Sequence, residues 1–144
     1  MEWYWLLVIL VTHYIADFWV QTHEQSIKKS SSLEYLTLHI VTYTLCWLPL
    51  IITIVSINMS DLGLNIWNGG ESDGTGYFFG YTYTAIAMVF AGHWITDFVT
   101  SKAAKLEFSK PDGEGIRTGF QIVGFDQMIH YTHLYLVFYW LTNL

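Results

Sequence analysis

The chain has 144 residues, of which 53% are hydrophobic, 18% aromatic and only 12% charged. An average soluble domain carries about 25% charged residues, so this composition argues against a soluble domain and favours a small membrane protein. The formal net charge of −6 argues against nucleic acid as a partner, because binding phosphates requires clustered Lys and Arg.

Four apolar segments are long enough to cross about 30 Å of hydrocarbon, which takes about 20 helical residues. They cover residues 3–21, 35–57, 77–100 and 120–140. Helices are expected because every backbone polar group in lipid must be hydrogen-bonded internally. We therefore predict an all-α fold, with residues 1–144 as a single transmembrane domain of four transmembrane helices in a bundle.

The connections between these segments predict the orientation of the chain. Residues 22–34 contain Lys28 and Lys29, and residues 101–119 contain the other four basic residues. Residues 58–76 contain acids but neither Lys nor Arg, and their Gly-rich sequence predicts an exposed connector. By the positive-inside rule, the first and third connections face the cytoplasm, while the second connection and both termini face outward.

One polar pattern occurs in both the first and the third segment. Residues 13–18 read His-Tyr-Ile-Ala-Asp-Phe and residues 93–98 read His-Trp-Ile-Thr-Asp-Phe, so His, Ile, Asp and Phe recur at the same spacing. The two helices run in the same direction across the membrane. The chain is therefore expected to be a parallel two-hairpin repeat about an axis along the membrane normal, with both His-x-x-x-Asp faces inward.

The second and fourth segments add polar residues near their cytoplasmic starts. At about 1.5 Å of rise per residue, seven ionisable side chains fall within one layer about 10–15 Å thick. They are His13, Asp17, His39, His93, Asp97, Asp126 and His130. A carboxylate that faces lipid costs several kcal/mol, so we expect these side chains to point into the bundle and to be paired.

The chemistry of these seven residues predicts a site for a divalent transition metal. A spacing of four residues places an imidazole nitrogen and a carboxylate oxygen on one helical face, which suits chelation and equally suits an Asp that orients a His. Such donors without a thiolate favour zinc, manganese or iron. Seven candidate ligands are more than one tetrahedral metal ion can bind. Two metal ions would account for them, and so would one ion whose ligands are oriented by the remaining residues. We expect His133 to pack between helices and His23 to be solvated.

The ordered motifs also carry a family resemblance over nearly the whole chain, apart from the second connection. They are His13-x-x-x-Asp17-Phe18-x-x-Gln21-Thr22, His39, His93-x-x-x-Asp97, Thr100-Ser101-Lys102 and Gly124-Phe125-Asp126-Gln127-x-x-His130. This set resembles the domain of unknown function 3307 family, small membrane proteins of bacteria and tailed phages, and its phage members most closely. The resemblance implies a four-helix fold in the bacterial cytoplasmic membrane and the same polar residues, but no activity.

Three functions fit these residues. The first is a metal-dependent membrane hydrolase that acts from the cytoplasmic side on a lipid-like or phosphorylated substrate, with Asp126, Asp97 or Asp17 as the catalytic base. The second is a proton or cation relay through the same side chains. The third is a non-enzymatic, phage-type factor that engages a host membrane protein. The expected partners are the lipid bilayer and either a second copy of the chain or a host membrane protein.

Overall fold

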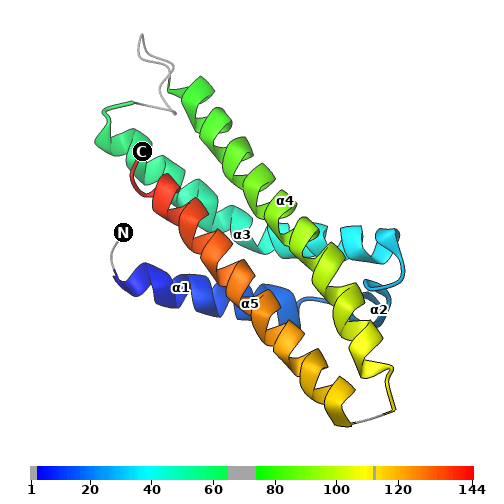
Figure 1. The fold of residues 1–144 in the computed structure, drawn as a ribbon. Helices are drawn as coiled ribbons and strands as arrows, with labels where there is room; N and C mark the ends of the chain where they lie inside the picture. The colour runs from blue at the N-terminus through cyan, green and yellow to red at the C-terminus, as the bar shows by residue number, and fades with distance from the viewer. Residues whose placement is uncertain (1–2, 65–73, 112) are drawn as a thin grey trace.

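The computed structural model describes residues 3–64, 74–111 and 113–144, and 87% of these residues are helical. Three long helices, α3 (Leu33–Asp61), α4 (Thr75–Phe108) and α5 (Gly113–Leu141), follow the short helices α1 (Trp3–Tyr14) and α2 (His23–Lys28) (Figure 1). The described residues contain no strand. The predicted all-α fold is confirmed.

The first predicted helix is divided in the structure. α1 ends at Tyr14, and Ile15–Trp19 form a π-helical turn, η1, in which the Val20 N–H donates to the Ile15 carbonyl at 3.0 Å. A π turn carries an extra residue, so it changes the direction of every later side chain. Within this turn Ala16 and Asp17 are both buried.

The predicted connection of residues 22–34 contains a helix, α2, that the apolar pattern does not reveal. Its start is a capping box: the Gln25 N–H donates to Thr22 Oγ1 at 3.2 Å, and the Thr22 N–H donates to Gln25 Oε1 at 2.8 Å. Gln25 is buried, and its amide also donates to Thr42 Oγ1 of α3 at 3.3 Å. The cap therefore starts α2 and fixes it against α3.

α4 and α5 form a close hairpin that extends beyond the predicted segments. α4 continues to Phe108 and α5 begins at Gly113 rather than at residue 120, with Pro111 between them. A Cβ added at Gly119 would lie 2.6 Å from the Phe108 ring, and one added at Gly92 would lie 2.2 Å from the imidazole of His133. Both glycines thus permit close packing between these two helices.

The long helices lie in a bundle with two chemically different ends. α4 packs against α5 and α3, α1 packs against α5, and α2 packs against α3. Figure 1 shows both termini, the end of α3 and the start of α4 at one end, with α2 and the α4–α5 connection at the other. The apolar core lies on the terminal side of the histidines, and its largest members are Trp47, Tyr43, Phe138, Ile51 and Met59.

Among the described helices, α3 is long and apolar enough to cross a membrane, and the Trp3–Trp19 segment is apolar but shorter. α4 and α5 each carry one His–Asp pair in their apolar segment, and these polar residues lower the hydropathy of both helices. The four-span arrangement, the single domain and the repeat axis therefore stay predictions. Much of the predicted connector of residues 58–76 lies outside the described residues, which omit 65–73.

Candidate metal centre

The structure brings all seven predicted site residues together. Six of them, from five different elements, are at most 3% exposed, and Asp126 is half-buried. His13 comes from α1, Asp17 from η1 and His39 from α3, while α4 and α5 each contribute one His–Asp pair. Residues far apart in the sequence thus form one continuous polar layer inside the bundle.

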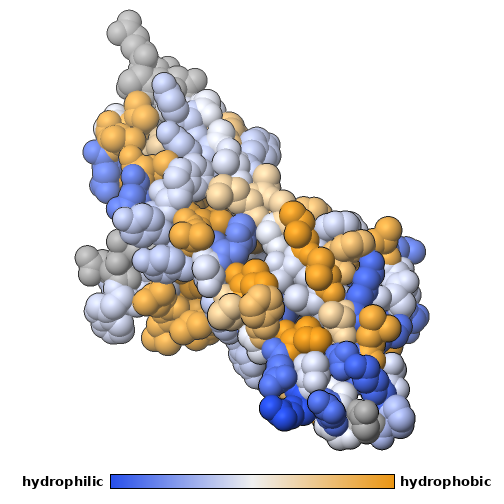
Figure 2. Space-filling model, viewed as in Figure 1, coloured by the Kyte–Doolittle hydropathy of each residue, from blue (hydrophilic) through white to orange (hydrophobic). Residues whose placement is uncertain are grey.

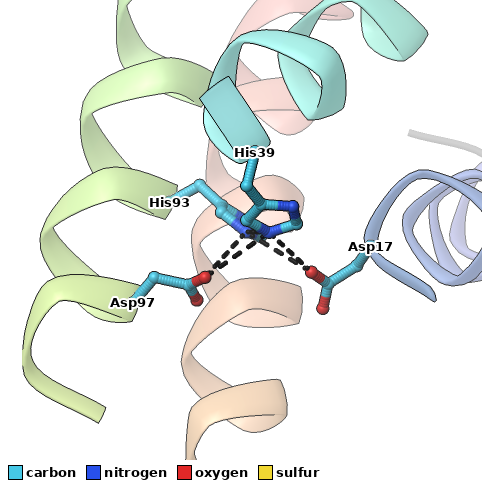
Figure 3. A group of neighbouring side chains, drawn as sticks. All are labelled: Asp17, His39, His93 and Asp97. Carbon is cyan, nitrogen blue, oxygen red and sulfur yellow. Dashed lines mark hydrogen bonds and ion pairs between the residues drawn. The ribbon is translucent and has the colours of Figure 1, made fainter. Parts of the chain in front are cut away.

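Four of these side chains, Asp17, His39, His93 and Asp97, form what we call the Asp/His quartet (Figure 3). One donor atom from each lies within 4.8 Å of the other three. His39 Nε2 is 3.1 Å from Asp17 Oδ1 and 3.5 Å from Asp97 Oδ2. His93 Nε2 is 3.6 and 3.7 Å from the same two oxygens, and the two Nε2 atoms are 3.3 Å apart.

Within the described part of the chain, the two quartet imidazoles make hydrogen bonds through Nε2 but not through Nδ1. The Nδ1 atoms of His39 and His93 have no hydrogen-bond partner among the described residues, and neither does Asp17 Oδ1. The His93 ring instead stacks on Tyr43, with ring centroids 3.7 Å apart, and on His130 at 4.0 Å. Both Nε2 atoms are thereby directed toward the carboxylates.

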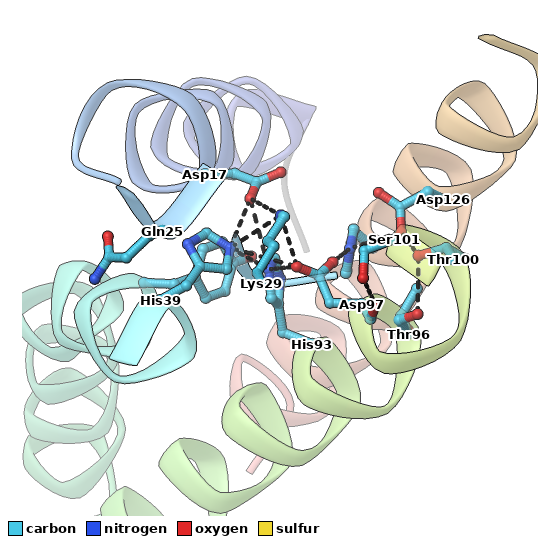
Figure 4. A network of polar contacts seen from close by, with 12 residues as sticks. Asp17, Gln25, Lys29, His39, His93, Thr96, Asp97, Thr100, Ser101 and Asp126 are labelled. Atoms are coloured by element: carbon cyan, nitrogen blue, oxygen red, sulfur yellow. Dashed lines mark hydrogen bonds and ion pairs between the residues drawn. The ribbon is translucent and has the colours of Figure 1, made fainter. Parts of the chain in front are cut away.

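Lys29 is a site residue that the sequence interpretation missed. Its Nζ donates to Asp97 Oδ2 at 2.7 Å and lies 3.4 Å from His39 Nε2 and 3.9 Å from Asp17 Oδ1 (Figure 4). Burial alone lowers the pKa of Lys29, but the carboxylates of Asp97 and Asp17 outweigh it, so this pKa lies above its usual value. The ammonium therefore stays charged beside the quartet.

Asp97, Asp126 and His130 form a second donor group, again with donor atoms within 4.8 Å of one another. His130 Nε2 is 3.1 Å from Asp97 Oδ1 and 3.4 Å from Asp126 Oδ1. The Thr100 hydroxyl makes a close contact with Asp126 Oδ1, and Gln127 Nε2 donates to Asp126 Oδ2 at 3.1 Å. Asp97 belongs to both groups.

His13, predicted as a ligand, lies beside both groups instead of within either one. Its two ring nitrogens pair with the Tyr43 hydroxyl and with Gln127 Oε1, each at 2.9 Å. The Gln127 amide in turn donates to Asp17 Oδ2 at 3.3 Å, so it lies between His13 and that carboxylate. In this arrangement His13 orients the neighbours of the quartet.

The two remaining histidines lie outside both donor groups. His133 Nε2 pairs with the Met88 carbonyl at 2.9 Å and packs over Gly92, and His23 is exposed. The catalytic roles predicted for Asp17, Asp97 and Asp126 stay predictions. All three carboxylates belong to the two groups of potential metal donors. An oxygen that binds a metal has a different role from one that accepts a proton as a catalytic base.

Comparison with known proteins adds no assignment to this geometry. A scan against protein-family models and searches of curated proteins and of solved structures find no match. The resemblance to the domain of unknown function 3307 family therefore stays a prediction, and the function is argued from the site alone.

Proposed function

We propose that this chain is an integral membrane protein whose Asp/His quartet binds a divalent transition metal. The distances between donor atoms support this proposal most directly. A tetrahedral ion with ligands at about 2.0–2.1 Å holds its donor atoms about 3.3–3.4 Å apart. Five of the six distances within the quartet are between 3.1 and 3.7 Å, and they join buried atoms from three separate elements.

The charge of the buried layer supports a divalent cation. Asp17, Asp97 and Asp126 bring three negative charges, and Lys29 brings one positive charge, which leaves two negative charges uncompensated when the histidines are neutral. Charges away from water are costly unless they are paired or coordinate a metal. One divalent ion neutralises the layer. Two nitrogen and two oxygen donors in a closed, four-ligand set favour zinc over manganese or iron.

The distribution of apolar side chains supports four membrane-spanning helices. Large hydrophobic residues are exposed on α1, α3, α4 and α5, for example Leu7, Leu45, Val99 and Leu136. Figure 2 shows hydrophobic residues across the middle of one face and the strongest hydrophilic colour at the end formed by the α4–α5 connection. Polar side chains that are buried beneath an apolar surface are expected of a bundle in lipid.

The apolar core favours a closed metal centre over a relay that crosses the membrane. On the terminal side of the quartet, the buried polar residues in the described chain are Thr44 and Thr82, among aliphatic and aromatic neighbours. A proton or cation would need more polar groups than these two hydroxyls to travel outward. With both Lys-containing connections on the cytoplasmic side, the centre lies in the cytoplasmic half of the bilayer.

Elemental analysis of the protein, purified in mild detergent without chelator, tests the proposal. We expect at least one equivalent of a transition metal per chain, and His39→Gln should remove at least one equivalent. His133→Gln is the matched control, because His133 pairs with the Met88 carbonyl and lies outside both donor groups. Metal content well below one equivalent in the wild type, or equal losses in the two variants, would overturn the proposal.

A further inference from the structure

The two oxygens of Asp97 face two different sets of donors. Oδ2 is the quartet atom and also accepts from Lys29 Nζ at 2.7 Å. Oδ1 faces the opposite way, toward His130 Nε2 at 3.1 Å. Figure 4 shows Asp97 between the Lys29 side of the site and the α5 side, where Asp126 lies. This carboxylate therefore has the position of a bridge between two centres.

The second donor group is held in place by residues outside it. Asp126 and His130 are four residues apart on α5, so their side chains share one helical face. The Thr100 hydroxyl of α4 contacts one oxygen of Asp126, and the Gln127 amide donates to the other. Such outer partners fix the rotamer of a carboxylate ligand. The group is thus oriented before any ion arrives.

We propose that Asp97, Asp126 and His130 bind a second divalent ion, with Asp97 bridging it to the ion in the quartet. This inference rests on the proposed function. An ion at this position would take the place of the hydrogen bond between His130 Nε2 and Asp97 Oδ1, with the proton of the neutral imidazole then on Nδ1. Ions that share a carboxylate in two-metal sites lie about 3.5–4 Å apart.

The two sites differ in the chemistry that they support. The quartet supplies four protein ligands and is closed, whereas the second group supplies three and leaves a position for water. Asp126 is also the most exposed carboxylate of the layer, with 14% of its side chain accessible against 4% for Asp17 and 2% for Asp97. Activation of a water molecule, as in hydrolysis, therefore belongs to the second ion.

Charge sets the order in which the two sites fill. With the histidines neutral, as metal binding through Nε2 requires, a first divalent ion would neutralise the two negative charges that remain after Lys29 is counted. A second ion gives the layer a positive charge, so it binds more weakly than the first. A titration should accordingly resolve a tight equivalent and a weaker one.

Equilibrium dialysis of the full chain against increasing Mn²⁺ or Zn²⁺ tests this proposal. The wild type should bind two equivalents, and His130→Gln should bind one. His133→Gln is the matched control on the same helix and should bind two, because His133 pairs with the Met88 carbonyl outside the group. If His130→Gln does not fold, Asp126→Asn, which keeps the side-chain volume, should also bind one equivalent.

Electron paramagnetic resonance of the Mn²⁺-loaded protein gives a second readout. Two equivalents bridged by Asp97 should broaden the six-line signal of an isolated Mn²⁺ through spin coupling, and His130→Gln should restore the six lines. A wild type that saturates at one equivalent, or two equivalents without coupling, would overturn the bridged second site and leave the quartet proposal standing. Binding of no metal at all would overturn both.

Discussion

At the scale of single residues, Lys29 is expected to limit how strongly the proposed metal centre attracts a cation. Its ammonium lies on the side of the quartet formed by Asp97, His39 and Asp17, with 18% of its side chain exposed. It neutralises part of the carboxylate charge while no ion is bound. Once an ion is bound, the same ammonium repels it at short range.

Replacing Lys29 with Met should strengthen metal binding by the quartet about tenfold or more, equivalent to about 1.4 kcal/mol. The substitution removes a positive charge beside the donor oxygens and keeps the length of the side chain. Competition with a chelating dye measures the affinity. Lys28→Met is the control, because Lys28 pairs with the exposed Glu24, away from the quartet. Unchanged or weaker binding by Lys29→Met would contradict the role assigned to its charge.

Most of the site residues predicted from the sequence belong to a spacing motif within a single helix. The His-x-x-x-Asp repeat and the Asp-x-x-x-His of α5 reveal six residues because two ionisable groups four apart in an apolar segment must face inward. Lys29 and Thr100 carry no such periodic signal. Lys29 meets Asp97 across 68 residues of sequence, and a pairing of that range depends on the packing of whole helices.

At the scale of elements, the α4–α5 hairpin depends on close approach at Gly92. The His133 ring lies where a side chain at this position would begin, and the Met88 carbonyl holds that ring in place. Gly92 directly precedes His93, so the spacing of the two helices and the position of a quartet ligand are linked.

Gly92→Ala should destabilise the protein by about 1–3 kcal/mol, because the new methyl group would lie 2.2 Å from His133 Nε2 and the two helices must separate. Thermal unfolding in detergent measures the change. Gly80→Ala on the same helix is the control, since nothing lies within 4 Å of its added Cβ, and its stability should be unchanged or higher. Equal transitions for the two variants would count against this packing.

Element boundaries show where the sequence pattern stops being informative. The length of the apolar segments locates α3, α4 and α5, but these helices continue beyond the apolar segments through polar residues, and α5 begins at Gly113. α2 has a readable start signal in Thr22 and Gln25, whose side chains fit a capping box. The π turn at Asp17 has no comparable signal. Whether a helical turn takes an extra residue depends on how its side chains pack against neighbouring helices.

At the scale of the whole molecule, the two basic connections predict an orientation. In the proposed four-helix topology, Ser31 and Ser109 are expected to face the cytoplasm and Asn143 is expected to face outward. These three side chains are exposed, so they are accessible to a reagent on their own side.

Cysteine labelling of intact cells tests this orientation in a Cys46→Ala background. An impermeant maleimide should label Asn143→Cys and should leave Ser31→Cys and Ser109→Cys unlabelled, because the positive-inside rule retains the basic connections in the cytoplasm. Permeabilised cells are the control and should label all three. Labelling of Ser31→Cys or Ser109→Cys before permeabilisation would refute the orientation.

The contacts of Asp17 also bear on how the chain is made. A growing chain emerges from the ribosome in sequence order, so Asp17 is synthesised long before His93 and Asp97. His39 Nε2, 3.1 Å from Asp17, and Lys29 Nζ, 3.9 Å from it, both belong to the first hairpin. The first hairpin therefore supplies Asp17 with a hydrogen-bonding imidazole and a positive charge, from Lys29, before α4 is made. Under the proposed function, metal loading is expected to be a late step of biogenesis, because His93 and Asp97 must be synthesised first.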